Sequence, residues 1–267
     1  MMTLNLLLAN KPDWLEVTSH SSSVANVVAS PPRASGWSKS PFSLALRLQE
    51  NGGVSVEEDD SDRLLPCFCA ERHINPGGTF CVFYGSTNPI FEKSAALHWW
   101  HCLRIFLLNQ NYAERQGRWP LEAGLSHGAA ADFQIEMEKV ATPLGWRDEL
   151  LRGIFRNKGW LADTLPKVSK NREHLLNSRT PCPRGCTWKH GRSRKKSCGN
   201  DTCRPDCKKQ HKPILRADCP NRKAIEQISL LEHRRRKEEL AVARKLHDAG
   251  FRCCNTMKGC SLRDLER

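Results

Sequence analysis

One stretch of the sequence is apolar over most of the circumference of a helix, and it constrains the fold more than any other feature. Residues 93–110 have helical character, and their apolar side chains are Ala95, Ala96, Leu97, Trp99, Trp100, Leu103, Phe106 and Leu107. A helix that is hydrophobic nearly all round belongs inside a core, because no solvated face is left for it. The chain therefore has to surround this helix with other elements.

The segments on either side predict a fold of the α+β class. Residues 42–48 suggest a strand, and residues 80–84 are rich in β-prone side chains. Further along, apolar residues recur at helical spacing over 130–141, with Ser126 as the expected N-cap, and a third helix is expected near 147–156. We expect a short antiparallel sheet followed by helices.

Charge and cysteine content divide the chain near residue 170. Residues 171–267 contain 25 Lys or Arg and 11 Asp or Glu, which gives a net charge of +14, whereas residues 1–170 have a net charge of −1. Nine of the 13 cysteines lie in the second part, but only one of the eight tryptophans does. Small polar regions of this kind usually fold around a metal or disulfides, because apolar burial alone is insufficient.

These differences predict four segments. The first is a partly loop N-terminal segment, and the second is a folded α+β domain with the helices described above. A polar linker and a cysteine-rich, basic and zinc-binding region follow, the latter with a long helix near residues 222–249. The expected bounds of the four segments are 1–37, 38–165, 166–177 and 178–267.

Three features favour the cytoplasm over an oxidising compartment or a membrane. The apolar run near the N-terminus has no basic leader and is too short for a secretory signal. No stretch approaches the roughly 20 apolar residues that span a bilayer. An odd number of cysteines also fits a disulfide framework poorly. We expect cytoplasmic thiols, with zinc bound to some of them.

The candidate catalytic residue is Cys81. Residues 72–82, hereafter the Cys81 loop, read RHINPGGTFCV, so His73 and Asn75 precede the cysteine across a Pro-Gly-Gly turn. A cysteine between apolar residues is ordinarily a buried, inert side chain. After a polar loop with His and Asn, it can instead be a nucleophile held beside its oxyanion stabiliser. From the residues alone, both interpretations stay open.

The Cys81 loop resembles the active-site loop of ubiquitin-conjugating (E2) enzymes, which carry His-Pro-Asn and then Gly-x-Ile-Cys-Leu. His73 and Asn75 match the first element, although Ile74 replaces the proline and the interval from Asn to Cys is shorter. The second element is matched by Gly78, Phe80, Cys81 and Val82. The chain is most similar to the bacterial E2 domain-associated cysteine-rich proteins. The resemblance covers residues 40–267, and its specific part is the Cys81 loop.

This resemblance implies an E2-like component of a bacterial ubiquitin-like conjugation pathway. Cys81 would accept the modifier as a thioester for transfer to an amine, Asn75 would stabilise the oxyanion, and His73 would organise the loop. The implied partners are an E1-like activating enzyme and a ubiquitin-like modifier. A non-catalytic E2-like scaffold with structural zinc is the alternative.

The C-terminal cysteines indicate a structural Zn²⁺ site, because thiolates paired three or four residues apart can hold one side of a tetrahedral ion. The first-choice ligands are Cys182, Cys186, Cys198 and Cys203, with Cys207 as the main rival. Cys253, Cys254 and Cys260 form a last cluster, which could complete a second site with Cys219 or Cys207 or form a reversible disulfide within itself.

Two basic clusters, residues 192–196 and 234–237, raise another alternative, a zinc-dependent nucleic-acid-binding protein. Residues 171–267 contain one Trp, one Phe and no Tyr, so this part of the chain lacks a platform on which bases could stack. A basic surface also suits an acidic protein partner, and both partners stay open.

Overall fold

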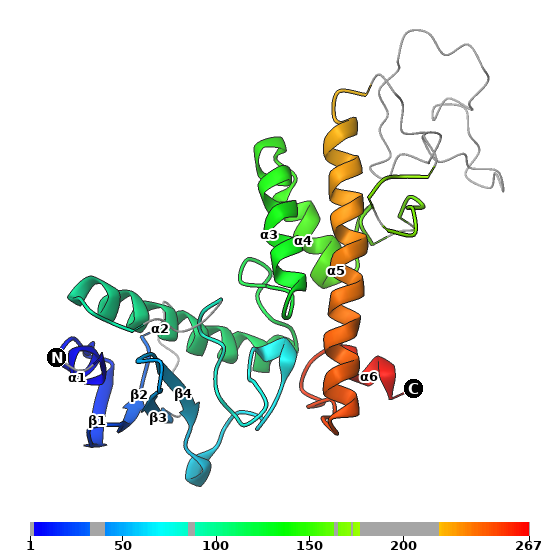
Figure 1. The fold of residues 1–267 in the computed structure, drawn as a ribbon. Helices are drawn as coiled ribbons and strands as arrows, with labels where there is room; N and C mark the ends of the chain where they lie inside the picture. Colours follow the sequence, from blue (N-terminus) through cyan, green and yellow to red (C-terminus); the bar gives the residue numbers. More distant parts are fainter. Residues whose placement is uncertain are drawn as a thin grey trace, which may run out of the picture. The chain divides into compact units, whose positions relative to one another are not determined.

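The structure is a computed structural model that describes residues 3–32, 41–84, 89–162, 165–171, 173–176 and 219–266 (Figure 1). The chain divides into two compact units. Unit 1 comprises residues 1–123 and 246–267, and unit 2 comprises residues 124–245. The cysteine-rich region of the sequence is therefore shared between the two units.

Unit 1 is built on a four-stranded antiparallel sheet in which each strand pairs with the next along the chain. The strands are β1 (Leu15–His20), β2 (Val24–Ala29), β3 (Phe42–Leu48) and β4 (Val54–Glu58). The strand predicted over residues 42–48 is confirmed as β3. Alternate residues of β2 and β4 are buried, as expected when one face of a sheet packs on a core.

The first two strands lie inside the segment that the sequence indicated as a partly loop N-terminal region, ahead of the boundary expected at residue 38. β1 is an edge strand in which Leu15 is the buried residue and the other side chains are partly or fully exposed. Its apolar pattern is weak because Leu15 alone is buried and Val17 packs only partly buried against the core. Pairing with β2, rather than composition, places it in the sheet.

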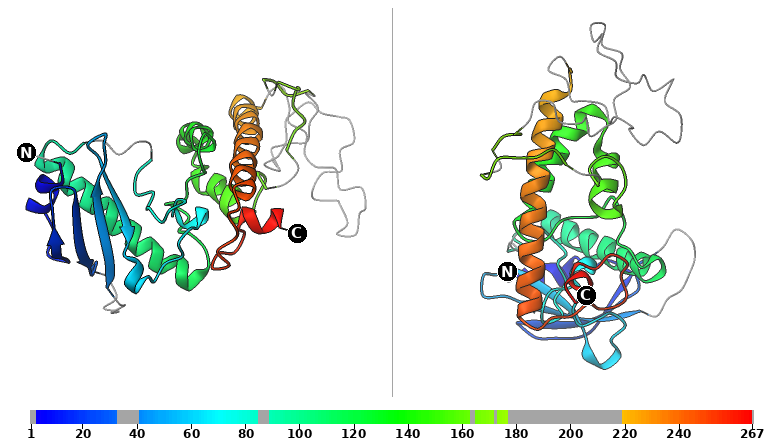
Figure 2. Two further views of the ribbon diagram at one scale, coloured as in Figure 1. Left: turned by 60° about the horizontal axis from the view of Figure 1, so that its bottom comes forward. Right: turned by 90° about the vertical axis from the view of Figure 1, so that its right-hand side faces the viewer.

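Two helices complete the core of unit 1. α2 (Lys93–Gln116) lies across the sheet (Figures 1 and 2), and α1 (Thr3–Ala9) contacts both α2 and β3. The Trp100 indole donates a hydrogen bond to the Leu7 carbonyl over 3.0 Å. The predicted buried helix is confirmed, but one side of it stays exposed, where Leu97, Ile105 and Tyr112 lie.

The last residues of the chain also belong to unit 1. The C-terminal segment, residues 249–266, ends in the short helix α6 (Ser261–Leu265), and its Met257 is buried in the same core as the sheet. The Lys258 amide donates to the Gly117 carbonyl over 2.7 Å, directly beyond the end of α2. Phe251 packs on Phe68 with ring centroids 4.7 Å apart.

Unit 2 is helical and contains α3 (Ala130–Ala141), α4 (Arg147–Arg156) and most of α5 (Arg222–Asp248). A short 3-10 turn, η3 (Thr142–Leu144), follows α3 and ends at Gly145. The bounds predicted for α4 and α5 agree with the structure to within a residue. Buried apolar side chains from α3, α4, α5 and the segment that follows α4 meet in one cluster, which includes Met137, Leu150, Trp160, Leu161 and Ile228.

The prediction that Ser126 caps the second helix is wrong. α3 begins after Ala129, and Ser126 lies outside it. The Ser126 backbone amide donates to Gln134 Oε1 over 2.8 Å, and the Ser126 hydroxyl accepts a hydrogen bond from Arg235 over 3.1 Å. The polar groups of Ser126 thus form hydrogen bonds with tertiary partners, which no local sequence pattern could show.

In the part of the chain that the structure describes, no helix is long and apolar enough to cross a membrane.

Candidate functional site

A small ladder of β-bridges beside β4 holds the Cys81 loop. Thr79 bridges Glu57 of β4, and Ile74 bridges Cys69 on one side and Phe80 on the other. The Phe80 side chain is buried and stacks on Phe106 of α2 with centroids 4.8 Å apart. The β-prone stretch at residues 80–84 therefore contributes a single bridge residue rather than a strand.

A tight turn reverses the chain before Cys81. Gly77 and Gly78 have φ angles of 88° and 87°, a region that side chains with a Cβ rarely adopt. The Gly78 amide donates to the Asn75 carbonyl over 3.0 Å, and the Asn75 amide donates to the Thr79 carbonyl over 2.8 Å. The two glycines are therefore required by the backbone of the loop.

A buried pair of side chains fixes the start of the loop to α2. Arg72 donates to Gln110 Oε1 over 2.7 Å, and Gln110 Nε2 donates back to the Arg72 carbonyl over 2.7 Å. Both side chains are almost fully excluded from solvent. Burial lowers the pKa of the Arg72 guanidinium below its ordinary value, an effect that nearby thiols and Glu58 partly offset. This pair joins the loop to the helix that follows it.

His73 has a structural place in the loop. Its backbone adopts the left-handed conformation with φ of 55°, and its carbonyl accepts the Cys81 amide over 2.8 Å. The imidazole packs on the Trp119 indole, with ring centroids 5.0 Å apart. These contacts agree with a role in organising the loop.

The Cys81 side chain is exposed. It is therefore not the buried, inert cysteine that its apolar neighbours in the sequence suggested. Its thiol donates to the Phe83 carbonyl over 3.5 Å. Partial desolvation by the surrounding atoms raises the pKa of Cys81 above its ordinary value of 9.0. At neutral pH the thiol is therefore mostly protonated, and nothing described around it favours the thiolate.

The Asn75 amide is also near the surface, but it points to another residue. Asn75 Nδ2 donates to Thr79 Oγ1 over 3.4 Å, and no hydrogen bond joins it to Cys81 within the described residues. The structure thus brings Cys81, Asn75 and His73 into one loop without placing the Asn75 amide on the thiol. To stabilise an oxyanion, the amide has to leave Thr79.

Besides Cys81, a pair of thiols lies at the other end of the same ladder. The sulfur atoms of Cys69 and Cys254 are 2.8 Å apart, and Cys254 Sγ also contacts Thr256 Oγ1 over 3.1 Å. The hydrogen bond from the Cys69 thiol lowers the pKa of Cys254 to about 6, against the opposing effect of burial. The same hydrogen bond and burial raise the pKa of Cys69.

The proposed zinc ligands are only partly described. Five of them, the first-choice four and Cys207, lie outside the described residues. Cys219 packs against the core of unit 2, and Cys253 and Cys260 are buried in the C-terminal segment of unit 1. Within the described ranges, no group of three or more His, Cys, Asp or Glu side chains is placed to hold a metal ion. The first-choice zinc site therefore stays a prediction.

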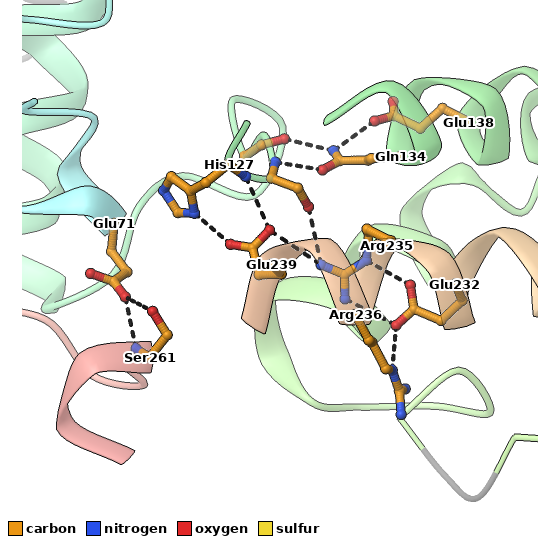
Figure 3. A network of polar contacts seen from close by, with 11 residues as sticks. Glu71, His127, Gln134, Glu138, Glu232, Arg235, Arg236, Glu239 and Ser261 are labelled. Atoms are coloured by element: carbon orange, nitrogen blue, oxygen red, sulfur yellow. Dashed lines mark hydrogen bonds and ion pairs between the residues drawn. The ribbon is translucent and has the colours of Figure 1, made fainter. Parts of the chain in front are cut away.

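A buried polar network in unit 2 uses part of the basic cluster at residues 234–237 (Figure 3). Glu232 is 1% exposed and accepts hydrogen bonds from Arg235 over 2.6 Å and from Arg236 over 2.7 Å. Glu239 accepts the His127 backbone amide over 3.0 Å and also contacts its imidazole. Arg235 is buried in this network, whereas Arg236 stays exposed while its guanidinium pairs with the buried Glu232. The sequence pattern did not reveal these ion pairs.

Unit 1 thus places a four-stranded antiparallel meander, a cysteine-bearing loop and a long helix in that order along the chain. Residues 14–121 match the model of the family described as Prokaryotic E2 domain. This match supports a bacterial E2-like family for this part of the chain, as the resemblance of the Cys81 loop implied. The match extends from just before β1 to just beyond α2 and includes the Cys81 loop. Neither a curated protein nor a solved structure matches the chain.

Proposed function

We propose that the chain is an E2-like component of a bacterial ubiquitin-like conjugation pathway, with Cys81 as the residue that carries the modifier. The observation that supports this proposal most directly is the exposure of Cys81 on the loop of a domain that matches the model of an E2-like family. An exposed thiol is accessible to a protein-bound thioester, whereas a buried one is not.

In the proposed reaction, the Cys81 thiolate attacks the C-terminal carbonyl of a modifier held as a thioester on an E1-like enzyme. A new S–C bond forms at Cys81, and the E1-like thiolate leaves. An amine of the target then attacks the same carbonyl, the bond to Cys81 breaks, and the amine proton passes to solvent or a base. Asn75 stabilises the oxyanion of this second step by a hydrogen bond.

The raised pKa of Cys81 shapes this mechanism. Because the described surroundings do not stabilise the thiolate, deprotonation has to be assisted when the E1-like partner docks. The Asn75 amide likewise has to exchange Thr79 for the oxyanion. We infer that the site is completed by its partners rather than fully formed in the free protein.

Reconstitution tests the proposal. The full chain is mixed with a cognate E1-like enzyme, its modifier and ATP, and adducts are measured by intact-mass spectrometry without reductant. We expect an adduct of one modifier that thiols remove, that disappears in Cys81→Ala, and that persists in Cys67→Ala, which removes another exposed cysteine. If the E1-like enzyme charges itself but no such adduct forms on this chain, the carrier role is wrong.

The alternative is a non-catalytic E2-like scaffold, and two observations favour it. The pKa of Cys81 is raised rather than lowered, and the Asn75 amide is held by Thr79. A scaffold predicts that Cys81→Ala keeps binding to its partners and full activity of the pathway in cells. A carrier predicts that this variant loses conjugation but keeps partner binding.

For the basic, cysteine-rich region, we further propose that it binds zinc and that its partner is a nucleic acid or an acidic protein. The internal ion pairs of Arg235 and Arg236 leave less of the 234–237 cluster available for such a partner. Native mass spectrometry of the purified chain would count bound zinc. Binding that resides in residues 178–267 and weakens steeply with salt would support a nucleic acid partner.

A further inference from the structure

The contact between Cys69 and Cys254 joins residues that are 185 positions apart in the sequence. Their sulfur atoms, 2.8 Å apart, are much closer than two thiols that merely share a core. A disulfide bond would bring them to about 2.05 Å, so only a small movement separates the two states. Cys69 is buried, and Cys254 is half-buried, which leaves one sulfur of the pair accessible to a small reagent.

The surroundings hold both residues in place. Cys69 exchanges two backbone hydrogen bonds with Ile74, in the ladder that continues to the Cys81 loop. On the other side, the C-terminal segment is attached by the amide and hydroxyl of Ser261, which donate to Glu71 over 2.8 and 3.1 Å (Figure 3). The buried Met257 gives a second attachment. The two thiols thus meet between anchored backbones.

We propose that Cys69 and Cys254 are a redox-active pair that forms a reversible disulfide by exchange with a small disulfide of the glutathione class. The bond would fix the C-terminal segment covalently to the ladder that carries the Cys81 loop. This site lies outside the reaction proposed for Cys81 and does not depend on it. It also differs from the pairings within the 253–260 cluster that the sequence suggested.

The exchange proceeds in two balanced steps. The Cys254 thiolate attacks one sulfur of the small disulfide, whose S–S bond breaks and releases one thiolate. Cys69 then loses its proton to that thiolate and attacks Cys254 Sγ, which releases the second small thiolate. Two protein thiols are oxidised, and one small disulfide is reduced to two thiols. Excess small thiol reverses both steps.

Cys254 is the expected site of first attack because it is the more accessible of the two sulfurs and because Thr256 Oγ1 can donate to its thiolate. Cys69 is shielded by the core and is placed to resolve the mixed disulfide. A metal centre would need further ligands, and within the described residues no such group surrounds the pair.

The test uses the full chain, reduced and then incubated with oxidised glutathione. Free thiols are blocked with N-ethylmaleimide, and the digest is analysed by mass spectrometry without reductant. We expect one cross-linked species that joins the peptides of Cys69 and Cys254 and disappears after reduction. The Cys69→Ser variant should instead retain one glutathione on Cys254, and Cys254→Ser should leave Cys69 unmodified.

The control variant is Cys253→Ser, which removes the adjacent thiol and should still form the cross-link. A disulfide between Cys254 and Cys253 or Cys260, or complete resistance of Cys69 and Cys254 to oxidation, would overturn the proposal. Repeating the assay in Cys81→Ala separates this site from the carrier function, because loss of Cys81 should leave the cross-link unchanged.

Discussion

At the scale of single residues, two of the thiols of unit 1 that are exposed or half-exposed, Cys81 and Cys254, have opposite electrostatic surroundings. Desolvation raises the pKa of Cys81, and no described hydrogen-bond donor opposes it. Cys254 is nearer the interior, yet donors on Cys69 and Thr256 lower its pKa to about 6. Hydrogen bonding to the charged form thus outweighs burial at one site and is missing at the other.

Alkylation by iodoacetamide should separate the two thiols by pH, because the thiolate is the reacting species. The rate at Cys254 should rise between pH 5 and 7 and then level off, whereas the rate at Cys81 should still increase above pH 9. Peptide mass spectrometry at each pH gives both rates. In Cys69→Ala the midpoint for Cys254 should move toward 9; identical profiles for the two cysteines in the unmodified chain would contradict this account.

The proposed oxyanion role of Asn75 can be isolated from its role in the loop. Asn75→Ala should leave loading of Cys81 nearly unchanged and slow transfer to an amine by about 100- to 1,000-fold. Single-turnover discharge of the loaded protein measures the second step alone. Thr79→Val removes the present partner of the amide and should keep transfer near the original rate. Equal losses in the two variants would indicate a purely structural role.

At the scale of elements, α5 is held to the loop before α3 by polar contacts that bury charge. Burial raises the pKa of Glu239, but its hydrogen bonds and charge interaction with His127 outweigh burial, so the net pKa is lowered from 4.5. A carboxyl with a depressed pKa in the folded state contributes stability above its unfolded pKa. It loses that contribution as the pH falls through the folded value.

Glu239→Gln should therefore destabilise unit 2 most above pH 4.5, and the difference from the unmodified chain should shrink on acidification below that value. Urea unfolding followed by circular dichroism at pH 3 to 7 measures this difference. Glu238→Gln removes the same charge from the neighbouring position of α5, where Glu238 lies 3.7 Å from the exposed Lys237, and should show a small effect throughout. A constant difference across this range would contradict the argument.

At the scale of the whole molecule, the C-terminal segment is part of the unit that contains the sheet, although the whole of unit 2, residues 124–245, lies between them in the sequence. Met257 is 2% exposed in the core that also contains Ile74 and Leu103. The E2-like family match ends at residue 121, so this segment is an addition that completes the core of the matched domain.

Met257→Ala should lower the free energy of unfolding of unit 1 by about 2–5 kcal/mol, because it leaves a cavity in a packed core. Thermal unfolding followed by tryptophan fluorescence would detect the change. Lys258→Ala is the matched control, since that side chain is exposed and its backbone contact with Gly117 is retained. A change in stability no larger than that of the control would show that the C-terminal segment is not part of this core.

Much of the fold could be predicted from local patterns. The apolar spacing around Leu103 and Leu150 placed α2 and α4, although α2 continues to Gln116, beyond the predicted end at residue 110. The sequence could not show the edge strand β1, because a strand with one buried residue has almost no periodic signal. The Cys81 motif could be recognised in the sequence because its residues and its Pro-Gly-Gly turn lie within one short stretch of the chain.

The sequence by itself determined the helices α2 to α5, the strand β3, the Pro-Gly-Gly turn and the resemblance of the Cys81 loop, because each depends on residues that are close along the chain. Tertiary structure alone decided the exposure of Cys81, the contact of Asn75 with Thr79 and the pairing of Cys69 with Cys254. Solvation and hydrogen bonding from distant segments set the reactivity of a thiol, and only the folded chain brings those segments together.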